Sequence, residues 1–300
     1  MGPKSGKIKK LNFSTNPPLI KMPSPYPRKQ FAQHWLQSDK ALNEIVNAAA
    51  LSPGDRILEI GPGTGILTRQ LLSRAESVVA VEIDRNLSQK LAKKLGEIPN
   101  FLLLCADFLD LDLESVLTQT PEHFHHPNKV VANIPYNITG PILEKLLGTI
   151  SQPPRMSYQS VVLLIQKEVA ERINAAPGSR TYGALSVRVQ YVAECEYICT
   201  VPAKAFYPAP KVDSAVVRLS PRPLALPADR PRWLETLVKV GFSSKRKMLR
   251  NNLKGLIDRD QLTQFLEQLN INPQVRAEDL SVSQWVALSN LLNLEHSVTP

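Results

Sequence analysis

Short apolar runs alternate with amphipathic stretches along roughly the first two thirds of the chain. Such runs indicate buried strands, whereas apolar residues three and four positions apart indicate helices. The strands predicted in this way are residues 56–60, 78–83, 101–104, 130–132, 160–165, 187–192 and 212–219. The predicted helices begin at Ser38 or Asp39 and near Pro141, and otherwise cover residues 65–74, 87–95 and 167–174. This alternation predicts an α/β fold with a mostly parallel sheet and helices on both faces.

The pattern changes after residue 220, where prolines cluster. Pro221, Pro223, Pro227 and Pro231 predict a linker. Only helical patterns follow it, near residues 233–240, 245–256, 260–269 and 283–292. We therefore expect an α/β domain over residues 28–220 and a small helical domain over residues 221–300. Residues 1–27 contain no acidic residue and no long apolar segment, which predicts a disordered basic arm.

Composition narrows the range of partners. The 300 residues carry a formal net charge of +9, which favours a polyanionic partner such as nucleic acid. No apolar run approaches the roughly 20 residues of a membrane span, so we expect no membrane association. Cys105, Cys195 and Cys199 form no CxxC pair and are odd in number, which predicts reduced thiols, no metal site and a cytoplasmic location. The basic arm leaves an organellar location open as an alternative.

A glycine-rich segment follows the strand at residues 56–60. Its G-x-G-x-G spacing permits a tight turn and close approach to a ligand, but differs from the G-x-G-x-x-G of dinucleotide-binding folds. Pro62 removes one amide donor, which weakens a phosphate-binding interpretation. Glu82 ends the next strand and can accept both hydroxyls of a ribose, and Asp107 can accept from an adenine amine. Together these features predict S-adenosylmethionine rather than NAD; an ordinary turn with solvated acidic residues is the alternative.

The segment Asn133-Ile134-Pro135-Tyr136 follows the apolar run at residues 129–132. The apolar run predicts a strand, and this segment predicts a rigid loop at the carboxyl edge of the sheet, where open α/β sheets bind ligands. Asn133 and the carbonyl of Ile134 can orient an exocyclic amine, and Tyr136 can stack on a flat base. The alternative is an ordinary strand-to-helix connection with a tyrosine that only packs.

Taken together, these segments resemble those of the small-subunit ribosomal RNA adenine dimethyltransferases over about residues 28–295. Residues 133–136 resemble that family's Asn-Leu-Pro-Tyr motif, residues 59–65 its methionine-end loop, and residues 81–84 its ribose motif. Further similar segments are residues 105–107, 166–169, 182–187 and 206–217, of which the last is long and highly specific. The resemblance implies a Rossmann-like class I S-adenosylmethionine-dependent methyltransferase fold with a small all-helical C-terminal domain.

The same resemblance implies a reaction and a partner. The enzyme would transfer two methyl groups to each of two adjacent adenosines near the 3′ end of small-subunit rRNA. We expect it to act as a monomer on rRNA within an assembling ribosomal particle. No general base is required, because the amine can lose its proton to water after the methyl transfer.

The resemblance also implies a role for individual residues. The implied cofactor contacts are His34, Leu36, Gly61, Gly63, Glu82, Asp107 and Asn133. The implied catalytic residues are Asn133, Tyr136 and Phe206, with the two aromatic rings enclosing the target base. His34 lies in Gln-His-Trp-Leu, where relatives often read Gln-Asn-Phe-Leu, and either Asn or His can donate to the methionine carboxylate. Alternatively, His34 and Trp35 only pack the N-terminal segment.

Cations gather on the C-terminal side of the linker. The RNA-binding candidates are Lys245, Arg246, Lys247, Arg250 and Lys254. On a continuous helix, Lys247, Arg250 and Lys254 would share one face. Leu249, Leu253 and Leu256 would then face inward. Such a stripe suits phosphate contacts. A merely solvated basic helix is the alternative.

Three other functions remain open at this stage. One is a large-subunit rRNA methyltransferase that confers antibiotic resistance and shares the Asn-x-Pro-Tyr arrangement; residues 206–217 favour the small-subunit enzymes over it. Another is a non-catalytic ribosome-assembly or transcription factor on the same scaffold, against which the joint presence of Glu82, Asp107, Asn133 and Tyr136 argues. Methylation of a small amine or of a protein fits the basic C-terminal stretch poorly.

Overall fold

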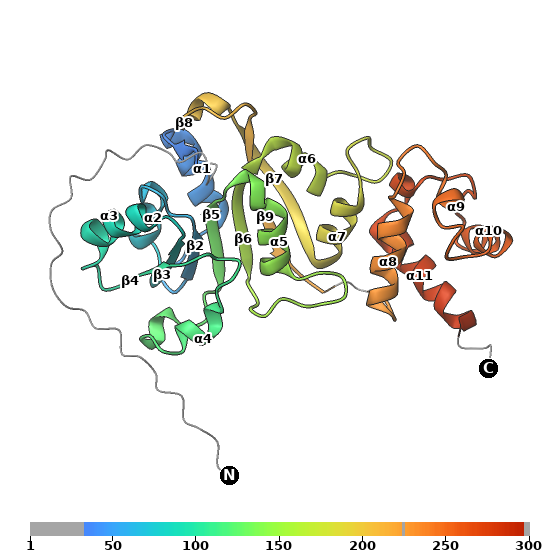
Figure 1. Ribbon diagram of the computed structural model, residues 1–300, viewed down its shortest axis with the longest axis horizontal. Coiled ribbons are helices and arrows are strands. Elements are labelled where there is room, and N and C mark those ends of the chain that lie inside the picture. Colours follow the sequence, from blue (N-terminus) through green and yellow to red (C-terminus); the bar gives the residue numbers. More distant parts are fainter. Residues whose placement is uncertain (1–32, 224–225, 297–300) are drawn as a thin grey trace, which may run out of the picture.

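A seven-stranded mixed sheet organises the larger part of the protein (Figure 1). The computed structural model describes residues 33–223 and 226–296, so the predicted basic arm lies outside the described residues. The strand order is β4-β3-β2-β5-β6-β9-β7. The strands are β2 (Arg56–Ile60), β3 (Ser77–Glu82), β4 (Phe101–Cys105), β5 (Lys129–Asn133), β6 (Ser160–Gln166), β7 (Ala193–Val201) and β9 (Ser214–Pro221). The five from β4 to β6 are parallel, and β9 runs antiparallel to both β6 and β7.

Both faces of the sheet are covered because its central strands are apolar at consecutive positions. On one face pack α1 (Asp39–Ala49), α2 (Ile66–Leu72) and α3 (Arg85–Leu95). On the other pack α4 (Leu113–Leu117), α5 (Thr139–Leu147) and α6 (Lys167–Ile173). Along β3, Val78 and Ala80 join the first apolar cluster, whereas Val79 and Val81 join the second. The expected sheet with helices on both faces is therefore confirmed. Short 3-10 turns lie at Glu122–Phe124, Tyr136–Ile138, Ala203–Ala205 and Ala277–Asp279.

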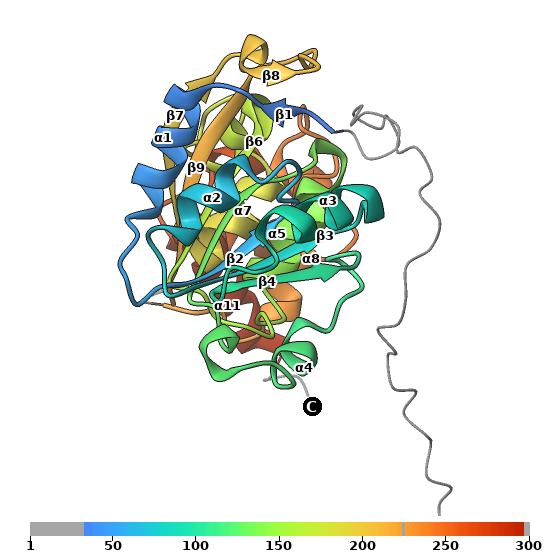
Figure 2. The same cartoon turned by 90° about the vertical axis from the view of Figure 1, so that its left-hand side faces the viewer.

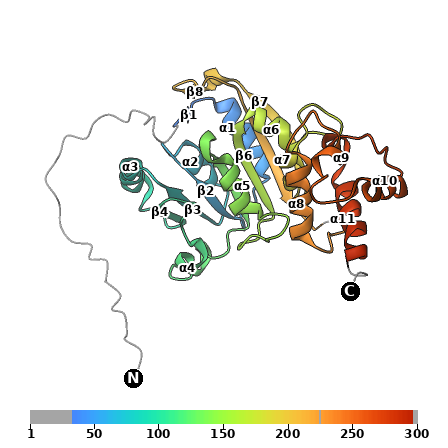
Figure 3. The same ribbon diagram turned by 45° about the vertical axis from the view of Figure 1, so that its right-hand side comes forward.

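The C-terminal helices form a third apolar cluster at one end of the molecule (Figure 3). They are α8 (Pro231–Gly241), α9 (Leu249–Asn252), α10 (Arg259–Gln268) and α11 (Val282–His296). The cluster extends across the predicted domain boundary, because Tyr182 and Val187 are buried within it. Phe242 links the two parts, with its ring centroid 6.4 Å from that of Tyr182 and 5.7 Å from that of Trp285. The boundary at residues 220 and 221 stays a prediction.

Two predicted elements are wrong. Residues 187–192 were expected as a strand, but they belong to helix α7 (Ala184–Val192), and the strand β7 follows it. The alternating apolar pattern arises because α7 is covered on two sides: Val187 packs into the C-terminal cluster and Val189 into the cluster of the sheet.

The predicted helix over residues 245–256 is reduced to the four residues of α9. The backbone at the start of α9 pairs elsewhere: Met248 forms an antiparallel β-bridge with Arg276, and Leu249 N–H donates to the carbonyl of Val275 at 2.9 Å. Asn252 also holds the carbonyl of Ser244 at 3.0 Å, so this segment follows a folded path rather than a continuous helix. Leu249 and Leu253 face inward as expected, but Leu256 is exposed, contrary to the prediction.

A two-residue ribbon closes over the carboxyl end of the sheet. The strands β1 (Trp35–Leu36) and β8 (Phe206–Tyr207) pair antiparallel, although they lie far apart in the chain, and Figure 2 shows them near each other at the top. Trp35 lies opposite Tyr207, and Leu36 lies opposite Phe206. Gln37 N–H extends the pairing by donating to the carbonyl of Ala205 at 2.8 Å.

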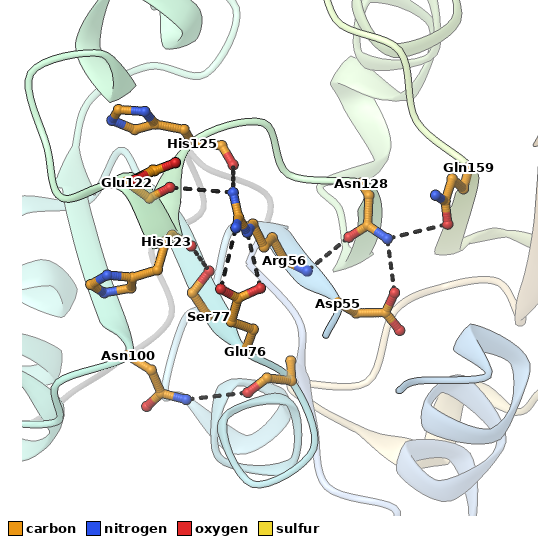
Figure 4. A network of polar contacts seen from close by, with 11 residues as sticks. Asp55, Arg56, Glu76, Ser77, Asn100, Glu122, His123, His125, Asn128 and Gln159 are labelled. Atoms are coloured by element: carbon orange, nitrogen blue, oxygen red, sulfur yellow. Dashed lines mark hydrogen bonds and ion pairs between the residues drawn. The ribbon is translucent and has the colours of Figure 1, made fainter. Parts of the chain in front are cut away.

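The opposite, amino end of the sheet is tied by a polar network (Figure 4). Arg56 binds the Glu76 carboxylate with two guanidinium nitrogens, at 3.0 and 3.3 Å, and donates to the carbonyl of His125 at 3.1 Å. Asn128 accepts from Arg56 N–H at 2.7 Å and donates to Asp55 at 2.8 Å. Because these bonds join β2, β3 and the connection into β5, they fix the strands far from the glycine-rich loop.

Among the helices of the described ranges, none combines the length and apolar character needed to cross a membrane. Within the same ranges, no three His, Cys, Asp or Glu side chains gather in an arrangement suited to a metal ion.

Candidate active site

A cleft of about 360 Å³ opens at the carboxyl edge of the parallel strands. Its walls come from β1 and from the segments that follow β2, β3, β4 and β5. Parallel strands deliver their carboxyl ends to one edge, which is where open α/β sheets form ligand sites. The predicted residues that line the cleft are His34, Leu36, Gly61, Gly63, Glu82, Asp107, Asn133 and Tyr136. Phe206 is the one predicted residue of the catalytic and cofactor sets that does not line it.

The glycine-rich loop bends sharply between β2 and α2. Gly61, Gly63 and Gly65 all have a positive φ, at 69°, 57° and 79°, a region that residues with a side chain rarely adopt. At Gly65 a Cβ atom would in addition lie 2.5 Å from Leu91 Cδ1, so the Leu91 side chain would have to shift. Near Gly61 the closest atom to such a Cβ is the carbonyl oxygen of Asn133, at 3.8 Å. The loop therefore brings its backbone directly beside the Asn133 segment.

Glu82 presents a fixed carboxylate to the cleft. Its Oε2 accepts from Gly63 N–H at 3.1 Å and its Oε1 from Asp84 N–H at 2.8 Å. Burial raises the pKa of Glu82, while the hydrogen bonds from Asp84 and Gly63 act in the opposite direction. Backbone donors thus orient both oxygens, and the lone pairs that remain can accept hydroxyl donors from a ligand.

Glu59 is a buried carboxyl that lines the cleft; the sequence analysis placed it in the loop at residues 59–65 but gave it no role of its own. Burial raises the pKa of Glu59 to about 8; the nearby Thr68 hydroxyl offsets this in part, and the Glu82 charge adds to it. Within the described ranges, neither Glu59 Oε2 nor Thr68 Oγ1 has a hydrogen-bond partner. The sequence held a signal for this residue, namely a single carboxyl inside the otherwise apolar end of β2.

Asp107 lies on a loop that a lysine from another helix holds in place. Asp107 Oδ1 accepts from Leu109 N–H at 2.9 Å. Lys145, on α5, donates to the carbonyls of Phe108, Leu109 and Leu111 at 2.6, 2.9 and 2.7 Å. Its Nζ also lies 4.9 Å from the centroid of the Phe108 ring. The helix that follows Tyr136 thus fixes the backbone around Asp107, a connection with no signal in the sequence spacing.

The Asn133–Tyr136 segment leaves the sheet as expected, because β5 ends at Asn133 and Tyr136 opens a 3-10 turn. Asn133 Nδ2 donates to the carbonyl of His34 at 3.4 Å, which leaves the amide oxygen as an acceptor. The Tyr136 hydroxyl pairs with the Ser214 hydroxyl at 2.6 Å, and burial raises the pKa of Tyr136. The ring of His34 stacks on Tyr136, with centroids 5.6 Å apart and an angle of 23°. One face of Tyr136 is therefore covered by the protein.

His34 has a fixed orientation that restricts its predicted role. Its Nδ1 lies 2.7 Å from the carbonyl oxygen of Pro208, so Nδ1 carries the proton and donates. In the neutral ring Nε2 is then an acceptor, and it donates to a carboxylate only as part of an imidazolium ion. Beside it, Trp35 Nε1 is buried without a hydrogen-bond partner among the described residues.

Phe206 does not enclose the cleft together with Tyr136. Its side chain is 4% exposed and packs in the apolar cluster that contains Leu36 and α1. Its neighbour Tyr207 is 50% exposed instead. The expected aromatic enclosure by Tyr136 and Phe206 is absent from this arrangement, because strand alternation turns Phe206 into the core.

The predicted RNA-binding residues lie on and beside α9, and Figure 1 shows this helix among the C-terminal helices, at the opposite end of the molecule from α2 and α3. Lys245, Arg246, Lys247 and Lys254 are exposed. Arg250 is half-buried, and its Nε is buried with no partner in the described part of the chain. Four of the five cations are thus available to a polyanion, although they are not arranged along one helix.

Comparison with known proteins identifies the family. Residues 26–294 match the ribosomal RNA adenine dimethylase family. A ribosomal RNA small subunit methyltransferase A from Nostoc sp. is 67% identical, covering 90% of this chain and 99% of the relative. The corresponding protein from Synechocystis sp. is 57% identical over 89% of this chain and 96% of its own length.

Two solved structures share the fold. A dimethyladenosine transferase from Plasmodium falciparum superposes with a TM-score of 0.71, at 26% identity, and covers 88% of this chain and 98% of its own. The 23S rRNA methyltransferase ErmE superposes with a TM-score of 0.67, at 27% identity, over 86% of this chain and 99% of its own. The fold is that of the class I methyltransferases, with additional C-terminal helices. The chain belongs to the ribosomal RNA adenine dimethylase family.

Proposed function

We propose that this protein is an S-adenosylmethionine-dependent enzyme that dimethylates two adjacent adenosines near the 3′ end of small-subunit rRNA. The observation that carries the proposal is the cleft itself. In a member of the adenine dimethylase family, one cavity brings together the glycine-rich loop, Glu82, Asp107, Asn133 and Tyr136. These residues come from four separate segments. They converge in one cavity, as a site that binds a cofactor and a base side by side requires.

The cleft fits S-adenosylmethionine in size and in chemistry. A volume of about 360 Å³ lies within the range of small-molecule sites. Glu82, with both oxygens oriented by backbone donors, would accept the ribose hydroxyls, and Asp107 would accept from the adenine amine. The glycine-rich loop would pass along the methionine half. When bound, the cofactor supplies an electrophilic methyl group on a positively charged sulfur.

Positioning is the task of the protein's own residues. The Asn133 amide oxygen accepts from the exocyclic amine of the target adenosine and orients its lone pair. Tyr136 stacks on the base with the ring face that His34 does not cover. Holding amine and methyl group in line provides most of the acceleration in such a site. The pairing of the Tyr136 hydroxyl with Ser214 fixes the ring for this purpose.

The small-subunit rRNA is favoured over the large-subunit rRNA by similarity. The Nostoc protein named for the small subunit is 67% identical, whereas ErmE, named for 23S rRNA, is 27% identical. To test the assignment, labelled cofactor is incubated with unmethylated small subunits and, separately, with large subunits, and the modified adenosines are mapped. We expect two adjacent dimethylated adenosines in the small subunit only. Modification confined to the large subunit, or none at all, would reject the assignment.

The basic surface around α9 supplies the RNA contacts that do not depend on sequence. Because Arg250 is half-buried, the informative variant replaces the exposed residues Lys245, Lys247 and Lys254 by Gln. Removing one lysine–phosphate pair should reduce the slope of log K against log salt by roughly 1. We expect a decrease of about 3 for the triple variant.

A matched control tests whether the position of the charges matters. Arg74, Lys93 and Lys94 are also exposed, and they lie on α3 and just after α2, at the other end of the molecule in Figure 1. Their replacement by Gln should leave the salt slope unchanged. Equal slopes for the wild type and the α9 triple variant would show that the α9 surface does not bind RNA.

We also propose that the protein is a monomer and that it acts on an assembling ribosomal particle in the cytoplasm. Support for a reducing compartment comes from the thiols, since the three cysteines are unpaired. Burial raises the pKa of Cys195 to about 12, which keeps it protonated and unreactive. Sedimentation of the purified protein, alone and with small-subunit precursors, tests whether it is a monomer and whether it binds the assembling particle.

A further inference from the structure

The loop between Val201 and Ser214 is anchored next to the target-base segment. Its two ends are joined by Ala203 N–H, which donates to Asp213 Oδ1 at 2.9 Å. The carbonyl of Asp213 accepts from Lys167 N–H at 3.0 Å, which ties the loop to the end of β6. Two further contacts reach the base segment: Ser214 pairs with the Tyr136 hydroxyl, and Pro208 O accepts from His34, the residue stacked on Tyr136. The loop is therefore a fixed wall beside Tyr136.

Strand register decides which side chain of this wall faces outward. In an antiparallel pair, residues opposite each other project from the same face of the ribbon, and the next pair projects from the other face. Leu36 and Phe206 form one pair, and both are buried in the core. Trp35 and Tyr207 form the other pair, and Trp35 lines the cleft. Tyr207 therefore projects beside the cleft wall, with half of its side chain in solvent.

Charge and exposed apolar area both mark this side of the cleft. The large hydrophobic residues exposed among those described are Ile83, Tyr207, Val212, Leu226 and Leu256. Ile83 lines the cleft, and Tyr207 and Val212 belong to the anchored loop. Lys204 and Lys211 are located on either side of Tyr207 in the chain, and residues 204–212 include no acidic residue. An aromatic ring between two cations matches a single nucleic-acid strand, with the base on the ring and the phosphates at the lysines.

We propose that the ring of Tyr207 is a stacking platform for the nucleotide next to the target adenosine, with Lys204 and Lys211 at the flanking phosphates. This inference rests on the proposed function, because it requires an RNA strand in the cleft. A base that enters the pocket must leave its stack, so its neighbour in the strand loses a stacking partner. Tyr207 replaces that partner. Base–aromatic stacking tolerates any base, so the platform would serve for both adjacent adenosines.

The test measures binding separately from methylation. The probe is a short single-stranded RNA with 2-aminopurine next to the target adenosine, and both anisotropy and quenching of its fluorescence are recorded. Wild type should quench the probe. Tyr207→Ala and Tyr207→Leu should lose the quenching and bind the RNA about tenfold more weakly, whereas Tyr207→Phe, which keeps the ring, should behave like the wild type. The salt slope should be unchanged in all three, because stacking releases no counterions.

Two controls make the outcome specific. Cofactor affinity should be equal in all the variants, which shows that they are folded around the cleft. Lys204→Gln with Lys211→Gln should lower the salt slope by roughly 1.4, about 0.7 for each phosphate contact on a single strand, while the probe stays quenched. Equal quenching and affinity in Tyr207→Ala would overturn the platform, even if the wild type methylates small subunits. Conversely, loss of quenching in Tyr207→Ala supports the platform even if the mapping experiment finds no dimethylated adenosines, a result that would count against the proposed function alone.

Discussion

The two ends of strand β2 carry buried carboxyl groups in opposite electrostatic situations. Asp55 precedes the strand and is 4% exposed, and Glu59, near its other end, is 1% exposed. Burial raises the pKa of both. At Asp55, however, Lys129, Asn128 and Ser52 donate hydrogen bonds at 2.9, 2.8 and 2.6 Å, and these lower its pKa below the usual value. Glu59 has no such set of donors among the described residues, and its pKa rises to about 8.

The amino edge of the sheet pairs its charged groups, although Ser160 Oγ at the start of β6 lacks a partner among the described residues, whereas the carboxyl edge leaves a buried carboxyl oxygen unpaired. At the amino edge, the Asp55–Lys129 pair and the Arg56–Glu76 pair satisfy one another. At the carboxyl edge, Glu59 Oε2, Trp35 Nε1 and Thr68 Oγ1 have no partner among the described residues, and three glycines hold a positive φ. Buried polar groups without partners cost stability, and they are retained mainly where function requires them. Replacing a residue that contacts the ligands at the carboxyl edge should therefore lower activity, whereas replacing a paired residue at the amino edge should lower stability.

The largest expected effect is on catalysis. Replacing Tyr136 by Ala removes the ring that stacks on the base and releases the alignment of the amine, so activity should fall on the order of a thousandfold. The free energy of unfolding should change little by comparison, because the ring is only half-buried. Tyr136→Phe keeps the ring, loses the hydrogen bond to Ser214, and should lose only a few-fold. Methyl incorporation into small subunits measures the activity of both variants. Full activity in Tyr136→Ala would refute the stacking role.

At the amino edge the expected effect is on stability instead. Lys129→Met removes the cation beside Asp55, whose side chain is 6% exposed, and also two bonds to the carbonyls of Ala49 and Ala50. An unpaired buried charge remains, so the free energy of unfolding should fall by about 3 kcal/mol. The kcat of the folded protein should be unchanged. Urea denaturation measures the first quantity, and the double variant with Asp55→Asn should recover part of the loss. A drop in kcat without a drop in stability would contradict the division between the two edges.

The parallel sheet could be predicted from the sequence because its strands are short apolar runs with turns between them. The prediction failed at Val187–Val192, where the alternating pattern of a strand is produced by a helix with apolar neighbours on two sides. It also failed in the basic segment before Leu256. There, hydrogen bonds to Val275, which is distant in sequence, and to Ser244 decide the backbone path. Such tertiary contacts override local propensity, and the sequence pattern does not contain them.

The position of the candidate site could be predicted where residues with suitable chemistry lie at strand ends. Glu82, Asp107 and Asn133 each lie at or just after the carboxyl end of a parallel strand, and all of them line the cleft. The buried orientation of Phe206 could not be predicted, because it depends on the β1–β8 register, which joins residues far apart in the chain; its catalytic role stays a prediction. Lys145 was missed for the same kind of reason, since the carbonyls that it binds belong to a distant segment of the sequence.

The smallest of the three expected effects is a pH dependence of the free energy of unfolding, caused by Glu59 at the carboxyl edge. In the folded protein Glu59 keeps its proton up to pH about 8, whereas in the unfolded chain a glutamate ionises near pH 4.5. Its contribution to stability is therefore complete below pH 4.5 and is lost as the pH rises toward 8, at about 1.4 kcal/mol per pH unit. Glu59→Gln has nearly the same shape and does not titrate. Between about pH 5.5 and 7, wild type should lose about 2 kcal/mol relative to this variant, as measured by urea denaturation at several pH values. Parallel stability curves for the two proteins would show that Glu59 is ionised in the folded state, which would remove the contrast with Asp55.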